Sequence, residues 1–493
     1  MPASIGLTVD GRAVEVPDDG SSLLTVLRER LGLRGPKDGC SPQGQCGCCT
    51  VLVDGSPRVA CVTPARRVAG RVITTIDGLP DAEAWADAFV ATGASQCGFC
   101  TPGIICRLAA GGDLAAHLCR CTGWQTIREA AASAGGPQPA RDLDAAARRA
   151  SIEGGAPQAV GREVALGRGG FADDSAPLDA LVAVPDGRGG WAVGETLAEA
   201  RAHAGKVQGR RTTAPPRHPL AVPDGDWART LRTTWVEPAY LETDASWCEP
   251  GGEPASALGN GGAFGGKSAS PAPAAAKRLA DELGRPVRVL LSREDTVRLG
   301  PKRPPIAAGV REDGSGELVV ARTPGFTAVI AAYAPHLAVT EVDVPGPPTS
   351  VAPRAAGWAE AAVLLGSRTV TAPNGAVATA SITDDGVHVR VSCGDPLDEV
   401  VLRSYCIGAV HMALGWVRSE GLMVDDDGVV HDLTIRSFGI VRPNEMPHVE
   451  VTFDGDGPPV NGSDAVFAAV AAAEWARQGH PQDWPTNATG GSR

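Results

Sequence analysis

The sequence lacks a run of 18 consecutive apolar residues, an excess of positive charge and a basic N-terminal segment. A helix needs about 20 predominantly apolar residues to cross a bilayer, so we expect no membrane-spanning segment. Lysine and arginine number 45 and aspartate and glutamate 57, and the resulting net charge of −12 argues against nucleic acid or an anionic membrane as partner. The N-terminus shows neither the pattern of a secretory leader nor a twin arginine, which predicts a cytoplasmic protein.

The chain has 493 residues, which is too many for one hydrophobic core, and we expect about three domains. Apolar runs at 4–9 and 13–17 meet at Asp10-Gly11, a dipeptide typical of a β-hairpin. A helical period follows at 22–31, and short strands are predicted at 50–53 and 71–75. These elements fit a small half-open sheet with one helix.

The fold class predicted for the whole chain is α+β multidomain. Three helices are expected after the first sheet, at 84–91, 103–110 and 122–134. A segment rich in glycine, proline, alanine and arginine then predicts a linker. The remainder is expected to mix helices and strands, including a helix at 274–283 and a strand at 287–291. The predicted domains are 1–77, 78–135 and 161–493, with the linker at 136–160.

Ten of the 13 cysteines precede Thr122, and in a reducing compartment such crowding indicates metal binding. A [2Fe–2S] cluster needs four thiolates, and plant-type ferredoxins supply them with a C-x4-C-x2-C spacing and a distant fourth cysteine. Glycines at 39, 44 and 47 permit a tight loop whose N–H groups point at the cluster. Cys48 is expected to point away. The first predicted set is Cys40, Cys46, Cys49 and Cys61.

A second set consists of Cys97, Cys100, Cys119 and Cys121. Thr101-Pro102 should begin one helix and Thr122-Gly123 another, so two helix N-termini would face the negative charge of a cluster. Paired cysteines at these spacings can also hold zinc, and a few buried thiols are a further alternative.

Two segments then identify a family resemblance. The residues 96–103, QCGFCTPG, and 118–124, LCRCTGW, resemble the second-cluster motifs of the molybdenum hydroxylases, which include xanthine dehydrogenase, aldehyde oxidase and carbon monoxide dehydrogenase. The first cysteine set resembles their other cluster. The resemblance implies a β-grasp ferredoxin domain and a helical [2Fe–2S] bundle domain. The first spacing has one extra residue, and the 18 residues between Cys100 and Cys119 are fewer than in the family, so a turn or a helix should be lost.

The segment Gly261–Lys267, with Ser268, matches the P-loop pattern G-x4-G-K-S. A P-loop should follow a buried strand and begin a helix, but this segment follows a stretch of small residues and precedes two prolines. A glycine turn without a ligand is the second alternative. The segment also resembles the molybdopterin-binding subunit of the same family, which is longer than residues 161–493. That resemblance implies that Phe264 and Gly265 approach the molybdenum ligands.

Further cofactor contacts follow from the same resemblance. Pro353-Arg354 resembles an Arg-Gly-x-Gly loop of the family, which makes Arg354 a cofactor contact, and Gln96 matches a glutamine that bridges toward the pterin. The family's catalytic glutamate aligns with Asp464, before a helix expected at 466–473. Because aspartate is one methylene shorter than glutamate, the Asp464 carboxylate would lie about 1.5 Å short of the position of the family's catalytic carboxylate. A misplacement of about 1 Å can lower the reaction rate about 10²-fold. A helix N-cap is the alternative role for Asp464.

The resemblance implies an oxidoreductase that hydroxylates an aldehyde or N-heterocycle at molybdenum. Electrons would leave through the second cluster and then the first to an FAD-containing subunit or another redox acceptor. The implied cofactors are two [2Fe–2S] clusters and molybdopterin, the partner is a small-molecule substrate, and a homo-oligomer is left open. The alternative is a non-catalytic iron–sulfur electron-transfer subunit with a degenerate molybdopterin domain.

Overall fold

The computed structural model describes residues 4–205, 214–431 and 433–487. The first domain is a five-stranded sheet of order β2-β1-β5-β3-β4, and the predicted hairpin is confirmed, with Asp10 and Gly11 both at positive φ. The predicted helix begins at the N-cap Ser22 as α1 (Leu23–Thr25) and continues as a π-helical turn at Val26–Arg30. The strands are β1 (Ser4–Val9), β2 (Arg12–Pro17), β3 (Thr50–Val53), β4 (Ser56–Val59) and β5 (Val72–Thr74).

The helical domain places its three helices where their periodicity predicted them. They are α2 (Ala82–Thr92), α3 (Thr101–Ala109) and α4 (Gln125–Ser133). A 3₁₀ turn at Leu114–Ala116 lies between α3 and α4. α2 packs against α4.

The prediction of a linker at 136–160 is wrong, because the segment contains the helix α5 (Leu143–Gly154). Asp142 accepts hydrogen bonds at the N-cap from the N–H groups of residues 144 and 145, and Gly155 ends the helix in the left-handed conformation. α5 packs on the long helix α13 (Glu399–Arg418) and buries Arg149 and Glu153. The composition of residues 136–160 is typical of a flexible linker, but α5 is held in place because the side chains of one of its faces are buried in the protein interior.

The described residues after α5 form three four-stranded sheets, which confirms the expected mixture of α and β structure. The predicted helix at 274–283 and strand at 287–291 are also confirmed within two residues. The first sheet consists of β6 (Leu181–Pro185), β7 (Trp191–Gly194), β9 (Ala245–Cys248) and β10 (Val287–Leu290), with α8 (Leu197–His203) and α9 (Ala272–Leu283) packed on it. The second consists of β8 (Arg229–Arg232), β11 (Ile306–Val310), β12 (Gly316–Ala321) and β13 (Leu337–Val342), with α11 (Phe326–Tyr333) and α12 (Trp358–Leu365) against it.

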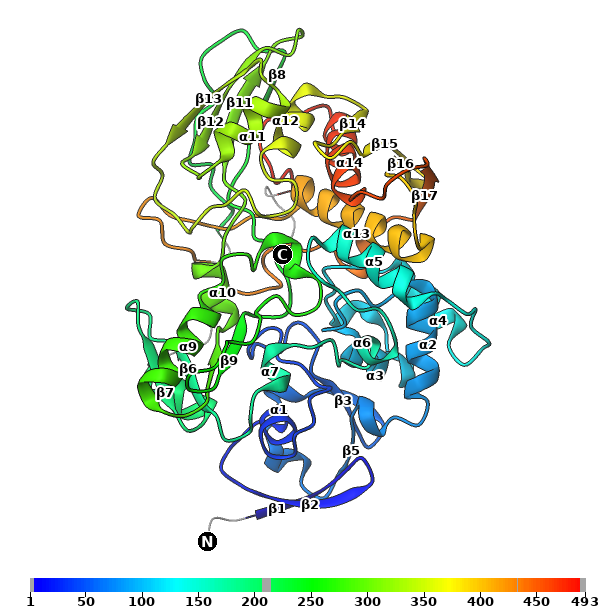
Figure 1. Ribbon diagram of the computed structural model, residues 1–493, viewed down its shortest axis with the longest axis vertical. Helices are drawn as coiled ribbons and strands as arrows, with labels where there is room; N and C mark the ends of the chain where they lie inside the picture. Colours follow the sequence, from blue (N-terminus) through cyan, green and yellow to red (C-terminus); the bar gives the residue numbers. More distant parts are fainter. Residues whose placement is uncertain (1–3, 206–213, 432, 488–493) are drawn as a thin grey trace.

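The third sheet contains β14 (Thr369–Thr371), β15 (Val377–Thr383), β16 (Gly386–Ser392) and β17 (Val449–Asp454), and it packs on α14 (Ser463–Arg477). Shorter helices are α6 (Arg162–Ala165), α7 (Ala172–Ser175) and α10 (Arg293–Leu299). In Figure 1 the N-terminal sheet lies at one end of the long axis, the β11–β13 sheet lies at the other, and α13 runs between them beside α5.

Helix α13 is the one described helix with the length and composition to cross a membrane, but 89% of its most apolar window is buried inside the protein. It is therefore the central core helix. The largest hydrophobic core is continuous from Leu7 in the first sheet to Trp484 near the C-terminus. The Trp124 indole at the start of α4 donates a hydrogen bond to the Val441 carbonyl at 3.2 Å. The iron–sulfur domains and the C-terminal half are thus packed together.

Candidate functional site

The first cysteine set lies in the loop before β3 and in the 3₁₀ turn after β4. Its four members are buried, with Cys61 the most exposed at 6%. Backbone N–H groups point at the sulfurs: those of Gln43 and Gln45 lie 3.2 and 3.5 Å from Cys40 Sγ. Contacts from Cys46 and Cys61, together with the Gln45 N–H, hold the pKa of Cys40 well below the usual thiol range, and the same contacts raise the pKa of Cys46 and Cys61. Four buried cysteines with backbone N–H groups directed at sulfur suit a cluster held by thiolates.

Glycine occupies two positions of this loop where the backbone is left-handed. Gly44 and Gly47 have φ of +69° and +77°, and a Cβ on Gly47 would lie 2.4 Å from the His117 ring. Gly39 has no positive φ, but a Cβ there would come within 3.0 Å of Phe99. Cys48, between two predicted ligands, is fully buried.

The second set lies at the starts of α3 and α4. Cys100 is the N-cap of α3, with Pro102 in the first turn as expected, and Cys121 Sγ lies 3.7 Å from Cys97 Sγ. Cys100 and Cys121 hold the pKa of Cys119 well below the usual thiol range, and Thr122 Oγ1 lies 3.2 Å from its sulfur. The helix dipoles add to the preference for negative charge.

Among the described residues, no three cysteine, histidine, aspartate or glutamate side chains are placed to hold one metal ion. A zinc ion needs such a convergence, whereas a [2Fe–2S] cluster distributes four thiolates over two irons. A cluster with two irons does not need such a convergence of three side chains on one ion.

The glycine turn at Gly262–Gly265 is strained in a way that places Phe264. Ala263 and Phe264 both adopt left-handed φ, near +55°, which is costly for residues with a side chain and is often found at functional sites. Gly265 has φ of +79°, and a Cβ there would lie 1.8 Å from the Ala352 carbonyl oxygen. Only glycine allows this approach of two backbone segments, and the Arg354 N–H then donates to the Phe264 carbonyl at 3.0 Å.

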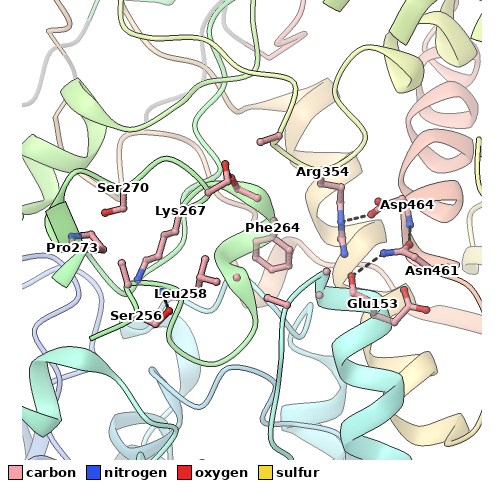
Figure 2. A pocket seen from close by; sticks show the side chains of 18 of the residues that line it. Glu153, Ser256, Leu258, Phe264, Lys267, Ser270, Pro273, Arg354, Asn461 and Asp464 are labelled. Carbon is pink, nitrogen blue, oxygen red and sulfur yellow. Dashed lines mark hydrogen bonds and ion pairs between the residues drawn. The ribbon is translucent and has the colours of Figure 1, made fainter. Parts of the chain in front are cut away.

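Arg354 links the turn to α14. Its guanidinium lies over the Phe264 ring at 5.0 Å, its Nε is 2.9 Å from Asp464 Oδ1, and its Nη2 donates to Ser463 Oγ at 3.0 Å. Figure 2 shows Phe264, Arg354 and Asp464 around one cavity of about 580 Å³. The structure thus brings together four residues that were predicted separately, Phe264, Gly265, Arg354 and Asp464.

The N-cap interpretation of Asp464 is wrong. Helix α14 begins at Ser463, earlier than predicted, and Gly462 is its N-cap, so Asp464 lies within the first turn. The Asn461 side chain instead accepts a hydrogen bond from the Asp464 N–H at 3.0 Å. Burial raises the pKa of Asp464, and the Arg354 guanidinium opposes this shift. A carboxylate with a raised pKa beside a cavity is typical of a general base.

Glu153 of α5 is a site residue that sequence reasoning missed. Its carboxylate accepts hydrogen bonds from the N–H groups of Gly462 and Ser463, at 3.1 and 2.9 Å, and forms an ion pair with Arg149. It therefore caps the helix that carries Asp464 and lines the same cavity. The signal that could have revealed it is the i, i+4 spacing of Arg149 and Glu153 on a helical face.

Gln96 lies beside the second cluster, in a small cavity of about 30 Å³ that it shares with Cys97 and Phe264. Its amide donates to the Cys121 carbonyl at 3.0 Å and to Ser404 Oγ of α13 at 2.9 Å. Second-cluster cysteines and the strained turn thus line one space, so this cluster is the nearer of the two to the cavity at Phe264.

The P-loop hypothesis is not supported. The strand β9 ends at Cys248 and the helix α9 begins at Ala272, so the glycine turn neither ends a strand nor begins a helix. Lys267, which a P-loop would direct at phosphate, is buried with its Nζ 2.9 Å from Glu242 Oε2. Burial raises the pKa of Glu242, and Lys267 opposes the shift.

Comparisons with known proteins support the same picture. Residues 7–70 match the family model described as a 2Fe-2S iron-sulfur cluster binding domain, and residues 75–132 match the [2Fe-2S] binding domain. The nicotinate dehydrogenase small FeS subunit from Eubacterium barkeri is 35% identical over 144 residues, which cover 26% of this chain and 91% of that protein. The chain belongs to the molybdenum hydroxylase family. It carries two [2Fe–2S] clusters.

The other relatives define how far the likeness extends. Aldehyde oxidoreductase from Megalodesulfovibrio gigas is 40% identical over 162 residues, but the match spans only 28% of this hydroxylase-family chain and 18% of that enzyme. The solved structure of aldehyde oxidoreductase from Desulfovibrio gigas matches 96% of this chain and 97% of its own with a TM-score of 0.68 at 14% identity. At that identity the likeness shows the fold, which extends through the C-terminal half.

Substitution of Cys119 by serine should remove one cluster and leave the other, because the two sets belong to separate loops. Iron should fall from about four to about two atoms per chain, and one of two low-temperature EPR signals of the dithionite-reduced protein should persist. Cys106→Ala is the matched control: burial raises the pKa of Cys106 to about 12, so this thiol should not ligate iron. Loss of both signals in a folded Cys119 variant would contradict the two-site assignment.

Proposed function

We propose that this chain is a compact oxidoreductase that hydroxylates an aldehyde or N-heterocycle at molybdenum and passes electrons through its two [2Fe–2S] clusters to an external acceptor. The observation that carries the proposal is the convergence of Phe264, Arg354 and Asp464, from three distant segments, on one cavity next to the second cluster. The cavity volume of about 580 Å³ lies within the usual range of small-molecule sites.

The residues present fit a molybdopterin. The close approach at Gly265 leaves the turn as a backbone wall, and Arg354, which stacks on Phe264, and Asp464 line the same cavity. Phe264, Gly265, Arg354 and Gln96 would hold the cofactor, which supplies oxygen transfer and two-electron redox chemistry when bound. The Asp464 carboxylate would accept a proton at Oδ2, while Arg354 holds Oδ1. The second cluster, whose cysteine ligands lie beside Phe264, would carry the electrons away.

The alternative is a non-catalytic electron-transfer subunit, and one contact favours it. Asp464, the candidate base, forms an ion pair with Arg354, so its negative charge is already compensated. Under this alternative the cavity would be a remnant of an ancestral site. Under either function we infer a cytoplasmic protein whose acceptor is a separate flavoprotein or another redox compound.

Metal analysis distinguishes the two functions. Protein produced in a host that makes the cofactor should contain near-stoichiometric molybdenum with a pterin, in addition to iron. Gly265→Ala should lose the molybdenum and keep the iron, because the new Cβ would clash with the Ala352 carbonyl. Gly284→Ala is the matched control, since Gly284 also has positive φ, at +63°, but open space around it. Wild-type protein that contained full iron and no molybdenum would refute the proposal that the chain is a molybdenum enzyme.

A further inference from the structure

A second large cavity, of about 460 Å³, lies between the ferredoxin-like domain and the sheet of β6, β7, β9 and β10. The ferredoxin-like side contributes Leu24 and Cys61, and the other side contributes Val184, Leu197 and Leu290. Cys61 is the one predicted cluster ligand that lines this cavity. An occupant would therefore lie against a ligand of the first cluster.

The two clusters face different cavities. Cys97, Cys100 and Cys121 line the space beside Phe264, whereas Cys61 lines the cavity between the ferredoxin-like domain and the sheet of β6, β7, β9 and β10. Electrons that enter at the second cluster would pass to the first cluster, whose ligand Cys61 lines this cavity. This direction rests on the proposed function, but the contact between Cys61 and the cavity does not.

The charges around the cavity disfavour an anionic occupant. Six carboxylates and four guanidinium groups line it, a formal excess of two negative charges. Three of the four arginines already pair with carboxylates: Arg28 with Asp173 and Asp174 at 2.7 and 2.9 Å, Arg288 with Glu29 at 2.7 Å, and Arg30 with Asp19. The fourth, Arg201, donates to Ser41 Oγ at 3.0 Å. An anion would meet net repulsion there.

The apolar part of the wall favours a ring of modest size. Leu24, Val184, Leu197 and Leu290 line the cavity, and Leu178, which is 65% exposed, lies at the same site. The volume lies within the 300–1,000 Å³ range of small-molecule pockets and is too small for a protein segment of any length. The lining therefore combines apolar contact with hydroxyl and guanidinium donors near the cluster.

We propose that this cavity binds a small neutral quinone that takes electrons from the first cluster. Each reduced [2Fe–2S] cluster gives up one electron and returns to its oxidised state. Two electrons from the two clusters and two protons from water convert the quinone to the hydroquinone, so electrons and protons balance.

The test uses the full chain and needs neither molybdenum nor substrate. Both clusters are reduced with dithionite, the excess is removed anaerobically, and reoxidation by tetramethyl-1,4-benzoquinone is followed by stopped-flow absorbance. The fully substituted ring cannot add to thiols. The rate should saturate with quinone concentration. In Ala198→Trp, where an exposed lining residue fills the cavity, the rate at low quinone should fall about tenfold.

Two controls separate the cavity from a general effect. Ala338→Trp, at an exposed alanine of β13, should match the wild type. Ferricyanide, an anionic acceptor that should not occupy the cavity, should reoxidise the Ala198 variant as fast as the wild type. The proposal would be overturned if the reoxidation rate rose linearly with quinone concentration and were the same in Ala198→Trp as in the wild type. It would also be overturned if Ala198→Trp slowed reoxidation by quinone and by ferricyanide equally. Because dithionite supplies the electrons, an inactive molybdenum site would not affect this result.

Discussion

Substitution of Asp464 by asparagine is expected to lower turnover by about 10²- to 10⁴-fold while molybdenum, pterin and iron remain bound. Asparagine keeps an oxygen that can accept from Arg354 Nε, so the contact to Phe264 and the first turn of α14 should persist. It cannot accept a proton as a carboxylate does. The loss of rate should therefore appear in kcat with the metal content unchanged.

The pH profile provides a second readout. The base must be ionised, and burial raises the pKa of Asp464, so kcat should rise with pH along a limb that lies above about pH 4, the usual aspartate range. This limb should vanish in the asparagine variant. Asp343→Asn is the matched control, because it removes the carboxylate of another Asp–Arg pair, with Arg322, whose aspartate side chain is 82% exposed. A variant at 464 with wild-type turnover and the same acid limb would show that another group is the base.

Substitution of Arg120 by methionine is expected to cost about 3–5 kcal/mol in the free energy of unfolding, because it leaves a buried carboxylate without its partner. Arg120 lies between two second-cluster cysteines and pairs with Glu420 at 2.5 and 2.8 Å, and its Nε donates to the Pro238 carbonyl. The Glu420 side chain is completely buried, and burial raises its pKa while Arg120 opposes the shift. This pair joins the iron–sulfur half to the loop that follows α13.

Urea unfolding followed by tryptophan fluorescence should measure this cost, because several large buried tryptophans lie in the C-terminal half. The double variant Arg120→Met/Glu420→Met is the control. It removes both charges, so its stability should lie closer to the wild type than that of the single variant. If the single variant lost less than about 1 kcal/mol, the pair would behave as an exposed one and the buried-charge argument would fail.

Local signals predicted most of the N-terminal quarter. The hairpin at Asp10-Gly11, the helices α2 to α4 and the grouping of the cysteines depend on contacts between residues near in sequence, and the structure places them as expected. The helix α5 departs from the prediction because its small and polar composition, typical of a linker, is combined with a buried helical face that includes Arg149 and Glu153.

The candidate molybdenum site could be predicted only as separate residues. Arg354 and Asp464 were each expected near a cofactor, but their ion pair joins residues 110 positions apart, and no periodicity encodes such a contact. The capping of α14 by Glu153 spans about 310 positions. Contacts between residues so far apart in sequence form only when whole helices and sheets pack together. Here the helices α5 and α14 both pack on α13, and this packing brings the paired residues together.

The capping of α14 by Glu153 has a consequence for synthesis on the ribosome. Domains fold as they emerge, N-terminal first, so the iron–sulfur half can take up its clusters early. The Glu153 carboxylate lacks the N–H groups of Gly462 and Ser463 until α14 arrives, and α14 is translated after every other described helix and strand. The side of the cavity that Asp464 lines is therefore the last to form. We expect the nascent chain to bind its iron–sulfur clusters while the cavity at Phe264 is still open on the side that α14 later covers. A bulky pterin could enter the cavity from that side before α14 packs.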